Sequence, residues 1–411
     1  MVYSKGLRLI LLFTKHTKIM EIEKRYLVSQ NLLSMVVLVL RRLLHMEDRT
    51  VQSADIDDGI PAGTRRLGFE MCRDLIGGVW ADIAEDEFHI KPLSGGLTNY
   101  LYVCSLPPDV PVPENQPQAV LLRVYGNIAT SSNFVVQNSV IFALMSEKGL
   151  GPKLYGMNPK ARIEELVPAE CLRTADLAQP NISRQIARKL ALFHSLDMPL
   201  CKEPRFLNDT MDSWMQQVNG ILKKKHSRSQ ESFMQKFRNY NLVDELKALK
   251  SILAAVTSPV VFSHNDLQEG NVLYTEESKT MTVIDWEYCS YNYRGYDFGN
   301  HFLEWCYDYH VTEPPYYSAK LENYPSRQQQ TEFFRAYLSE SGVEVTESML
   351  DGMYLEANTY ALASHFLWGL WAILQNEMSS IQFGFMEYGV SRFEGYFTMK
   401  ERLSTIGADI N

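Results

Sequence analysis

The stretch VVFSHNDLQEGNVLY, residues 260–274, decides the fold. The apolar runs at its two ends, VVF and VLY, are typical of short buried strands. Between them every residue except Leu267 and Gly270 is polar, and Asp266 and Asn271 lie five residues apart. A plain surface turn would explain this pattern. A loop that brings a base and a metal ligand together would explain it too.

The strand-like run MTVID, residues 281–285, favours the second explanation. It ends at Asp285, fourteen residues after Asn271. Transfer of a phosphoryl group to a hydroxyl needs a carboxylate beside the acceptor oxygen and oxygen ligands for Mg²⁺. We therefore predict that Asp266 orients the acceptor hydroxyl and takes its proton, while Asn271 and Asp285 bind the metal.

Two upstream features are consistent with phosphate binding. The segment SGGLTN, residues 94–99, lies between two strand-like runs, and glycine lets backbone N–H groups approach an anion closely. A plain hairpin turn explains that segment equally well. Arg123 interrupts the apolar run AVLLRVYG, and burying an unpaired cation is costly. We therefore expect Arg123 to face a partner such as a phosphate, unless it reaches the edge of the sheet.

The order of the predicted elements indicates the fold class. Five prolines between residues 107 and 117 predict an exposed hairpin loop. A small strand-rich part precedes a larger helical part, which is the order of a two-lobed α+β phosphotransferase with the nucleotide between the lobes. Helices are predicted at residues 69–80, 133–150, 182–196, 241–256, from 328 and at 352–378, with strands at 119–126 and 161–170 and a basic loop at 222–230.

Composition limits the classes of function. The chain has 411 residues, 45% hydrophobic and 22% charged, which is typical of a globular protein with a sizeable core. A net charge of −9 argues against general nucleic-acid binding and fits a small or cationic ligand. Six cysteines without a C-x-x-C pair indicate a reduced intracellular protein. The nine histidines show no metal-ligand spacing, and His194 and His365 are expected in the core.

The first 45 residues are apolar and basic and suggest no chemistry. Their longest charge-free stretch, residues 26–40, has 15 residues, short of the ~18 that a membrane span needs. No signal-peptide cleavage site follows it. The segment is interpreted as an extra helix, as an upstream extension with Met46 as an alternative start, or as a basic membrane-surface segment.

Aromatic and acidic residues crowd the region after Asp285. Residues 286–309 read WEYCSYNYRGYDFGNHFLEWCYDY, and Trp368 and Trp371 lie three residues apart on one face of a later predicted helix. Core packing accounts for many aromatics at helical spacing. Aromatic faces together with a carboxylate such as Glu304 are also what a quaternary ammonium requires, because such a cation cannot donate hydrogen bonds.

Residues 68–400 closely resemble the choline/ethanolamine kinase family. The motifs that carry the resemblance are LSGGLTN, VLLRVYG, LGPKLYG, VVFSHNDLQEGNVLY, IDWEYCSYNYRGYDFGNHFLEW and YALASHFLWGLWAILQ, in this order. LQEGN and LEWCYDY resemble the choline-preferring branch. The resemblance implies that a cytoplasmic homodimer transfers the ATP γ-phosphate to choline with Mg²⁺, giving phosphocholine for phosphatidylcholine synthesis.

The resemblance also implies the domains and the site. The fold would be protein-kinase-like, with an extension at residues 1–67, partly helical or disordered, a nucleotide-binding lobe with an antiparallel sheet at 68–167, and a mainly helical catalytic and choline-binding lobe at 168–411. Asp266 would be the base, with Asn271 and Asp285 on the metal. The ATP site would comprise Ser94, Gly95, Gly96, Leu97, Thr98, Asn99, Arg123, Glu165, Leu166, Val167, Gln268 and Asp285, and the choline site Tyr288, Glu304, Tyr309, Trp368, Trp371 and Tyr388.

The chain departs from the family pattern at two places. The helix after the Arg123 strand usually carries a Glu where this chain has Asn138, beside Gln137, which leaves the orientation of Arg123 open. The hinge segment, residues 165–171, ends in PAEC where relatives often carry basic residues.

Three alternatives remain at the level of sequence. One is an ethanolamine kinase, and another is an aminoglycoside-type phosphotransferase, which would not need the tryptophan pair. The third is a catalytically weakened homologue that acts as a partner protein. The intact Asp266, Asn271 and Asp285 argue against the last.

Overall fold

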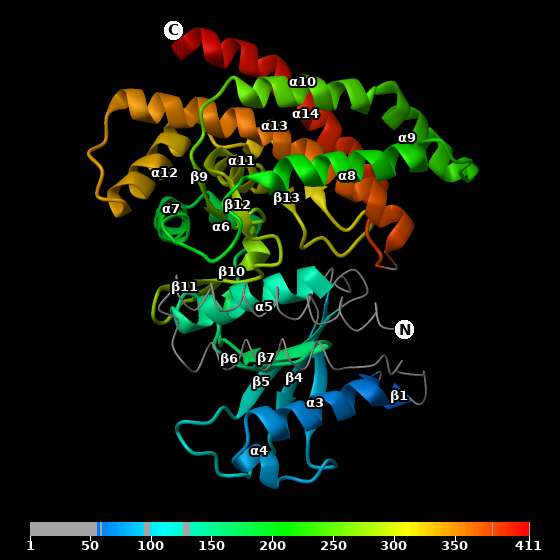
Figure 1. The fold of residues 1–411 in the computed structure, drawn as a ribbon, viewed down its shortest axis with the longest axis vertical. Coiled ribbons are helices and arrows are strands. Elements are labelled where there is room, and N and C mark those ends of the chain that lie inside the picture. Colours follow the sequence, from blue (N-terminus) through cyan, green and yellow to red (C-terminus); the bar gives the residue numbers. More distant parts are fainter. Residues whose placement is uncertain (1–55, 58–59, 94–98, 126–131, 380, 411) are drawn as a thin grey trace, which may run out of the picture. The chain divides into compact units, whose positions relative to one another are not determined.

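The structure is a computed structural model that describes residues 56–57, 60–93, 99–125, 132–379 and 381–410. The chain divides between Pro168 and Ala169 into two compact units (Figure 1). The predicted extension up to residue 55 and residues 94–98 of the glycine-containing loop lie outside the described residues.

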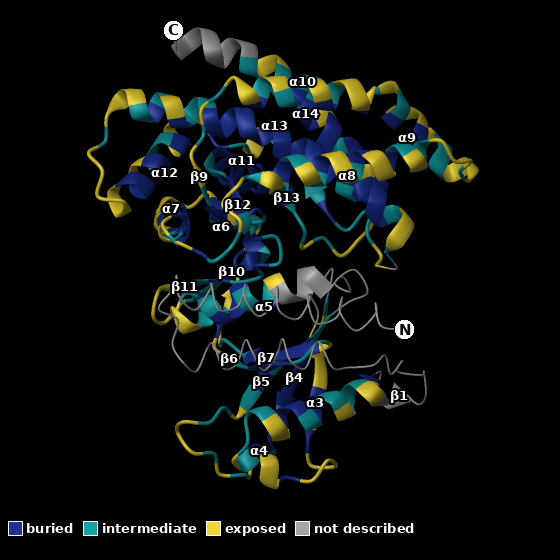
Figure 2. Ribbon diagram, in the orientation of Figure 1, coloured by how far each residue is buried: buried dark blue, intermediate teal, exposed yellow. Residues whose placement is uncertain are grey.

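The first unit is built on a five-stranded antiparallel sheet of order β3-β4-β5-β7-β6, and buried residues lie along β4, β5 and β7 (Figure 2). Its core includes Trp80 and Phe88. The predicted proline loop connects β4 to β5. The elements are β1 (Ile56–Asp57), β2 (Ile60–Pro61), α3 (Ala62–Leu75), α4 (Val79–Asp82), β3 (His89–Leu93), β4 (Asn99–Ser105), β5 (Ala119–Tyr125), α5 (Ser132–Glu147), β6 (Leu154–Met157) and β7 (Ala161–Glu165).

Helix α3 stops at the glycine pair that the sequence indicated. Gly77 and Gly78 both have positive φ, 68° and 56°, which glycine adopts without steric cost. A Cβ atom on Gly78 would lie 1.9 Å from Gln116 Nε2, so a residue with a side chain at this position would collide with Gln116. This Gln116 comes from the proline loop, and its Oε1 accepts a hydrogen bond from Val79 N at 3.1 Å.

Arg123 has a partner inside the sheet. It lies directly opposite Arg162 of β7, and the carboxylate of Glu164 bridges the two guanidinium groups. Arg123 Nε donates to Glu164 Oε1 at 3.3 Å, and Arg162 Nε donates to Oε2 at 2.7 Å. All three side chains are 5% exposed or less. The acid that the cation needs is therefore supplied by a neighbouring strand.

Asn138 of α5 contacts the second arginine. Its Oδ1 accepts from Arg162 Nη1 at 3.1 Å, and Arg162 also stacks on the ring of Phe142 at 4.1 Å from the centroid. Asn138 thus orients Arg162, while Glu164 is an acid bonded to Arg123.

The second unit is mainly helical, with three small antiparallel sheets of order β11-β10-β8, β12-β9 and β13-β14. Its helices are α6 (Thr174–Leu177), α7 (Pro180–His194), α8 (Arg205–Leu222), α9 (Arg228–Asn239), α10 (Leu242–Ala254), α11 (Arg294–Glu304), α12 (Arg327–Glu340), α13 (Glu347–Met378) and α14 (Phe385–Ile410), with 3₁₀ turns η2 (Glu269–Asn271) and η3 (Leu321–Asn323). Its strands are β8 (Glu170–Cys171), β9 (Val260–Ser263), β10 (Val272–Thr275), β11 (Thr280–Val283), β12 (Ser290–Tyr293), β13 (Tyr307–Asp308) and β14 (Ser318–Ala319).

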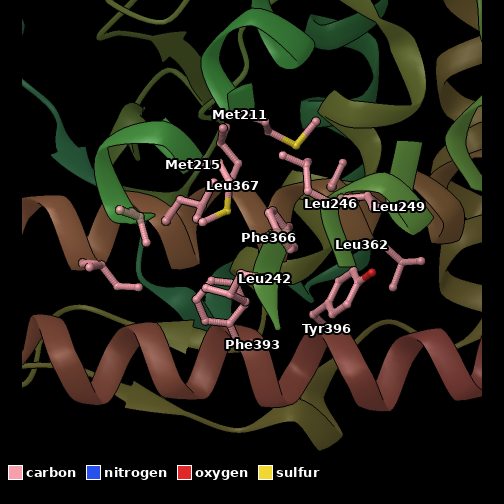
Figure 3. Close-up of a cluster of buried hydrophobic side chains, with 14 of the residues drawn as sticks. Met211, Met215, Leu242, Leu246, Leu249, Leu362, Phe366, Leu367, Phe393 and Tyr396 are labelled. Carbon is pink, nitrogen blue, oxygen red and sulfur yellow. The ribbon is translucent and has the colours of Figure 1, made fainter. Parts of the chain in front are cut away.

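Helix α13 is the core of this unit. Apolar side chains of α8, α10 and α14 surround its buried middle, as Figure 3 shows for Met211, Leu246 and Phe393. A Cβ on Gly369 would lie 2.7 Å from the Phe393 ring, so the close approach of α13 and α14 depends on that glycine. Among the described residues, no helix is both long enough and apolar enough to cross a membrane.

The helices predicted at 182–196, 241–256, from 328 and at 352–378 are present, but part of one loop prediction is wrong. Of the basic segment 222–230, only residues 223–227 form a loop, because α8 ends at Leu222 and α9 begins at Arg228. Met234 and Phe237 of that helix pack into the core, and this burial outweighs the charges at its start.

We expect Glu164→Gln to destabilise the first unit strongly. The change removes the carboxylate that bridges two buried guanidinium groups, and breaking a buried ion pair costs about 3–5 kcal/mol. Denaturant unfolding measures the loss, with the exposed Glu114→Gln as a matched control that should change stability by less than about 0.5 kcal/mol. A loss equal to that of the control would show that the bridge contributes nothing.

Candidate active site

The loop between β9 and β10 brings Asp266 and Asn271 together. Asn271 Nδ2 donates to Asp266 O at 2.8 Å and to Asp266 Oδ2 at 3.2 Å. The side-chain nitrogen of Asn271 is thus hydrogen-bonded within the loop, and its side-chain oxygen is the atom that can bind a metal. Gln268 Oε1 accepts from Gly270 N at 2.7 Å and so closes the η2 turn. The flanking strands are those that the apolar runs predicted.

The carboxyl of Asp266 has an unusual environment. Desolvation raises the pKa of Asp266 well above its ordinary value, and the negative charges of Glu304, Asp285 and Glu287 raise it further. The hydrogen bond from Asn271 acts in the opposite direction. A carboxylate with a raised pKa is a stronger base, which suits a group that accepts a proton from a hydroxyl.

Asp285 lies next to this loop, but it does not end the strand. Strand β11 ends at Val283, and Ile284 N donates to Asn271 O at 2.9 Å, which joins the two segments. Asp285 then has a left-handed backbone, with φ 63°. Such a conformation is uncommon for a residue with a side chain and recurs at functional sites. An amide oxygen and a carboxylate are suitable ligands for Mg²⁺.

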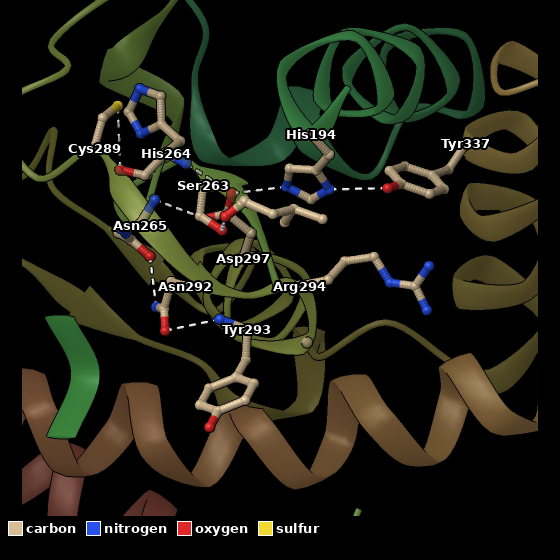
Figure 4. A network of polar contacts seen from close by, with 12 residues as sticks. His194, Ser263, His264, Asn265, Cys289, Asn292, Tyr293, Arg294, Asp297 and Tyr337 are labelled. Carbon is tan, nitrogen blue, oxygen red and sulfur yellow. Dashed lines mark hydrogen bonds and ion pairs between the residues drawn. The ribbon is translucent and has the colours of Figure 1, made fainter. Parts of the chain in front are cut away.

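Asp297 positions the loop backbone, and sequence reasoning missed this residue (Figure 4). Its Oδ2 accepts from His264 N at 2.7 Å, and its Oδ1 accepts from Asn265 N at 2.6 Å. His194 Nε2 lies 3.0 Å from Oδ2, and its Nδ1 lies 3.0 Å from Tyr337 Oη. His194 is buried, as predicted, and it links α7 and α12 to the loop.

A second residue of α11 contacts the loop. His301 Nδ1 lies 3.0 Å from Leu267 O, and burial lowers the pKa of His301 to about 4. The ring is therefore neutral near pH 7, and its Nδ1 must carry the proton that Leu267 O accepts. Trp305 Nε1 donates to the other ring nitrogen at 3.3 Å, which agrees with this tautomer.

The six residues predicted for the cationic substrate converge in one aromatic cluster. Trp368 packs edge-to-face on Tyr288 and on Trp371, with ring centroids 5.5 and 5.7 Å apart. Tyr388 lies 6.3 Å from Trp371 and 6.2 Å from Tyr309. Asn300 Oδ1 accepts from Trp368 Nε1 at 2.7 Å, which orients that indole. Tyr288 belongs to the cluster and also accepts, through its carbonyl oxygen, a hydrogen bond from Asn265 Nδ2 at 2.9 Å.

Glu304 is paired with a cation that sequence reasoning missed. Arg392 of α14 is fully buried, and its Nη2 donates to Glu304 Oε1 at 2.5 Å. Tyr309 Oη donates to Glu304 Oε2 at 2.9 Å, and Arg392 Nε donates to Tyr388 Oη at 2.9 Å. The guanidinium also lies over the Tyr307 ring, 3.7 Å from the centroid. The carboxylate expected to meet a substrate cation is therefore neutralised within the protein.

The nucleotide candidates that the structure describes in the first unit are near the ends of sheet strands. Asn99 begins β4 opposite Tyr125, and Arg123 lies in β5. Glu165 ends β7, where its Oε2 accepts from Lys153 N at 2.9 Å, and the half-buried Leu166 and Val167 follow.

Comparisons with known proteins agree with the family that the sequence motifs resemble. The family Choline/ethanolamine kinase matches residues 90–397. Choline kinase alpha of Mus musculus is 43% identical over 83% of this chain and 82% of its own length, and a choline/ethanolamine kinase of Homo sapiens is 41% identical over 83% and 87%. The solved choline kinase of Cryptosporidium parvum is 28% identical, with a TM-score of 0.70 over 83% of this chain and 97% of its own.

The fold and the site define a kinase-like phosphotransferase with an α+β architecture. More specifically, the chain belongs to the choline/ethanolamine kinase family. This membership sets aside the aminoglycoside-type alternative.

We expect the Glu304–Arg392 pair to show strong coupling in a double-mutant cycle. Arg392→Met and Glu304→Gln each leave one buried charge alone and should destabilise by about 3–5 kcal/mol. The double variant removes both charges and should lose clearly less than the sum of the two. Urea unfolding measures all three. The exposed pair Arg335–Glu347 is the control, where Arg335→Met should cost less than about 1 kcal/mol. Additive losses at Glu304 and Arg392 would contradict the pairing.

Proposed function

We propose that this chain is a choline kinase, which transfers the γ-phosphate of ATP to the choline hydroxyl and yields phosphocholine, the first step of phosphatidylcholine synthesis. Family membership supports the reaction class. The observation that supports choline as the substrate is the aromatic cluster of Tyr288, Trp368, Trp371 and Tyr388. A hydrogen bond from Asn265 to the Tyr288 carbonyl joins this cluster to the Asp266 loop.

The loop residues perform the chemistry at the acceptor. Asp266 accepts the hydroxyl proton as the oxygen attacks phosphorus, and Asn271 holds the Asp266 carboxylate by its hydrogen bond. Asn271 Oδ1 and the Asp285 carboxylate would bind Mg²⁺, which neutralises charge on the transferring phosphoryl group. Asp297 keeps Asp266 in place through the backbone of the two preceding residues.

The aromatic cluster binds the substrate cation mainly through ring faces. Because Arg392 neutralises Glu304, attraction for a trimethylammonium group comes from the quadrupoles of the rings. Glu304 orients Tyr309 and retains acceptor capacity, since an ionised carboxylate has about four lone-pair sites. A primary ammonium can use that capacity, whereas a quaternary ammonium cannot donate a hydrogen bond. Ethanolamine is therefore the second candidate substrate.

The remaining assignments belong to the same proposal. Ser94 to Asn99 and Arg123 would cover the phosphates, Glu165, Leu166 and Val167 would line adenine, and Gln268 would complete the ATP site. A homodimer follows from the family resemblance, and sedimentation tests it. A cytoplasmic location is supported by six cysteines that are all free. Side-by-side phosphorylation assays with choline and ethanolamine test the activity itself.

Asp266→Asn should reduce turnover by at least about 10²–10⁴-fold, since general base catalysis contributes that much. The substitution keeps the shape of the side chain, so ATP binding and melting temperature should stay near those of the parent protein. Steady-state kinetics with ATP binding by calorimetry measures both. Near-normal turnover of the purified variant would refute the assigned base.

Trp371→Ala should raise the Michaelis constant for choline by roughly threefold to thirtyfold, because a cation over an aromatic face is worth about 0.5–2 kcal/mol. Ethanolamine should suffer less, since its ammonium can still donate to Glu304. The control is Trp214→Ala, which removes a half-buried tryptophan packed against the helical core. That variant should lose stability without favouring either substrate. Equal effects of Trp371→Ala on both substrates would remove the ring faces from substrate recognition.

A further inference from the structure

The extended segment after α11 presents two chemically different faces. Successive side chains of an extended strand point to opposite sides. Tyr309 contacts Glu304 and Tyr388 and so belongs to the aromatic cluster. Asp308 and His310, one residue to either side, instead come together near Glu269 of the catalytic loop. This second face has no part in the proposed kinase chemistry.

Three potential metal ligands converge on that face. His310 Nδ1 lies 3.5 Å from Asp308 Oδ1 and 3.7 Å from Glu269 Oε1, and one donor atom from each residue lies within 4.8 Å of the others. Metal–ligand distances of 2.0–2.2 Å at a tetrahedral Zn²⁺ place neighbouring ligand atoms roughly 3.3 Å apart. Small side-chain adjustments would therefore bring all three atoms into a coordination sphere.

Glu269 is the residue that most needs a cation. Its side chain is fully buried, and its Oε1 accepts from Thr174 Oγ1 at 3.0 Å. Its Oε2 is also buried and has no hydrogen-bond partner in the part of the chain that the structure describes. Among the same residues, no lysine or arginine forms an ion pair with Glu269 or Asp308. A buried ionised carboxylate with one bare oxygen is costly unless a cation or a bound proton compensates it.

We propose that Glu269, Asp308 and His310 form a binding site for a divalent transition-metal ion of the Zn²⁺ type. An imidazole with two carboxylates suits Zn²⁺ rather than Mg²⁺, which prefers oxygen ligands. Because Asp308 and His310 are half-exposed, water supplies the fourth ligand. The site is separate from Asn271 and Asp285. A bound ion would tie the η2 turn of the catalytic loop to the strand segment that carries Tyr309.

Zinc titration of the full chain tests the proposal. With Mg²⁺ saturating, calorimetry should show one Zn²⁺ bound per chain, and Zn²⁺ should raise the melting temperature. Loss of an outer-shell partner of a metal already costs about 10–100-fold in affinity, so His310→Ala and Asp308→Asn should each lose about 100-fold or more. His89→Ala, which removes an exposed histidine of the first unit, should bind zinc like the parent protein.

The outcomes separate this site from adventitious binding. Equal zinc affinity in His310→Ala and in the parent protein would overturn the proposal. Cys171 is exposed, and its Sγ lies 3.3 Å from Gly270 O, close to the proposed site. If Glu269, Asp308 and His310 bind the metal, Cys171→Ser should retain zinc. Co²⁺ bound in place of Zn²⁺ should then show no thiolate-to-metal charge-transfer absorption band. Loss of zinc in Cys171→Ser would assign the metal to that thiol instead. None of these readouts depends on kinase activity.

Discussion

The hydrogen bonds from the loop backbone to Asp297 are the interaction on which the rest of the site depends. Two consecutive N–H groups, those of His264 and Asn265, donate to one buried carboxylate. Asn265 thereby keeps a left-handed backbone, with φ 67°, which directs the chain into Asp266. Without this anchor, two buried N–H donors would lack partners and the Asp297 carboxylate would keep only its contact with His194, which the low dielectric of the core makes costly.

Helix α11 extends this role along one of its faces. Asp297, Asn300, His301 and Glu304 occupy positions i, i+3, i+4 and i+7 of the helix, so they lie along one stripe. The first and third contact the catalytic loop, the second orients Trp368, and the fourth pairs with Arg392. One helix therefore sets the base and the substrate cluster relative to each other, since both are bonded to the same rigid element.

Charge is buried in both units, and each time it is compensated locally. Glu164 bridges two arginines in the sheet, and Arg392 neutralises Glu304 among the tyrosines. Such pairs add little net stability compared with apolar packing, but removing one partner is expensive. Glu269 is the exception among the described residues of the loop, since one of its carboxylate oxygens has no partner. Glu164 and Glu304, by contrast, each form ion pairs with arginine.

The sequence by itself determined the family, the α+β order and the strands that flank the Asp266 loop. Strand-like runs around Asp266 and Asn271, the glycine pair after α3 and the spacing of Trp368 and Trp371 are local patterns, and short-range sterics and periodicity control them. The motif resemblance likewise led to five residues that meet in the aromatic cluster, and to Glu304, which accepts a hydrogen bond from Tyr309 of that cluster.

Only the tertiary structure decided the partners of the buried charges. Glu164 lies 41 residues from Arg123, and Arg392 lies 88 residues from Glu304. Nothing local in the sequence shows that the polar residues of α11 are buried. Asp308 and His310 come close to Glu269 only through the fold, so histidine spacing alone could not reveal this cluster. Hydrogen bonds and ion pairs between distant segments depend on which faces the packed core brings together, and no short stretch of sequence contains that information.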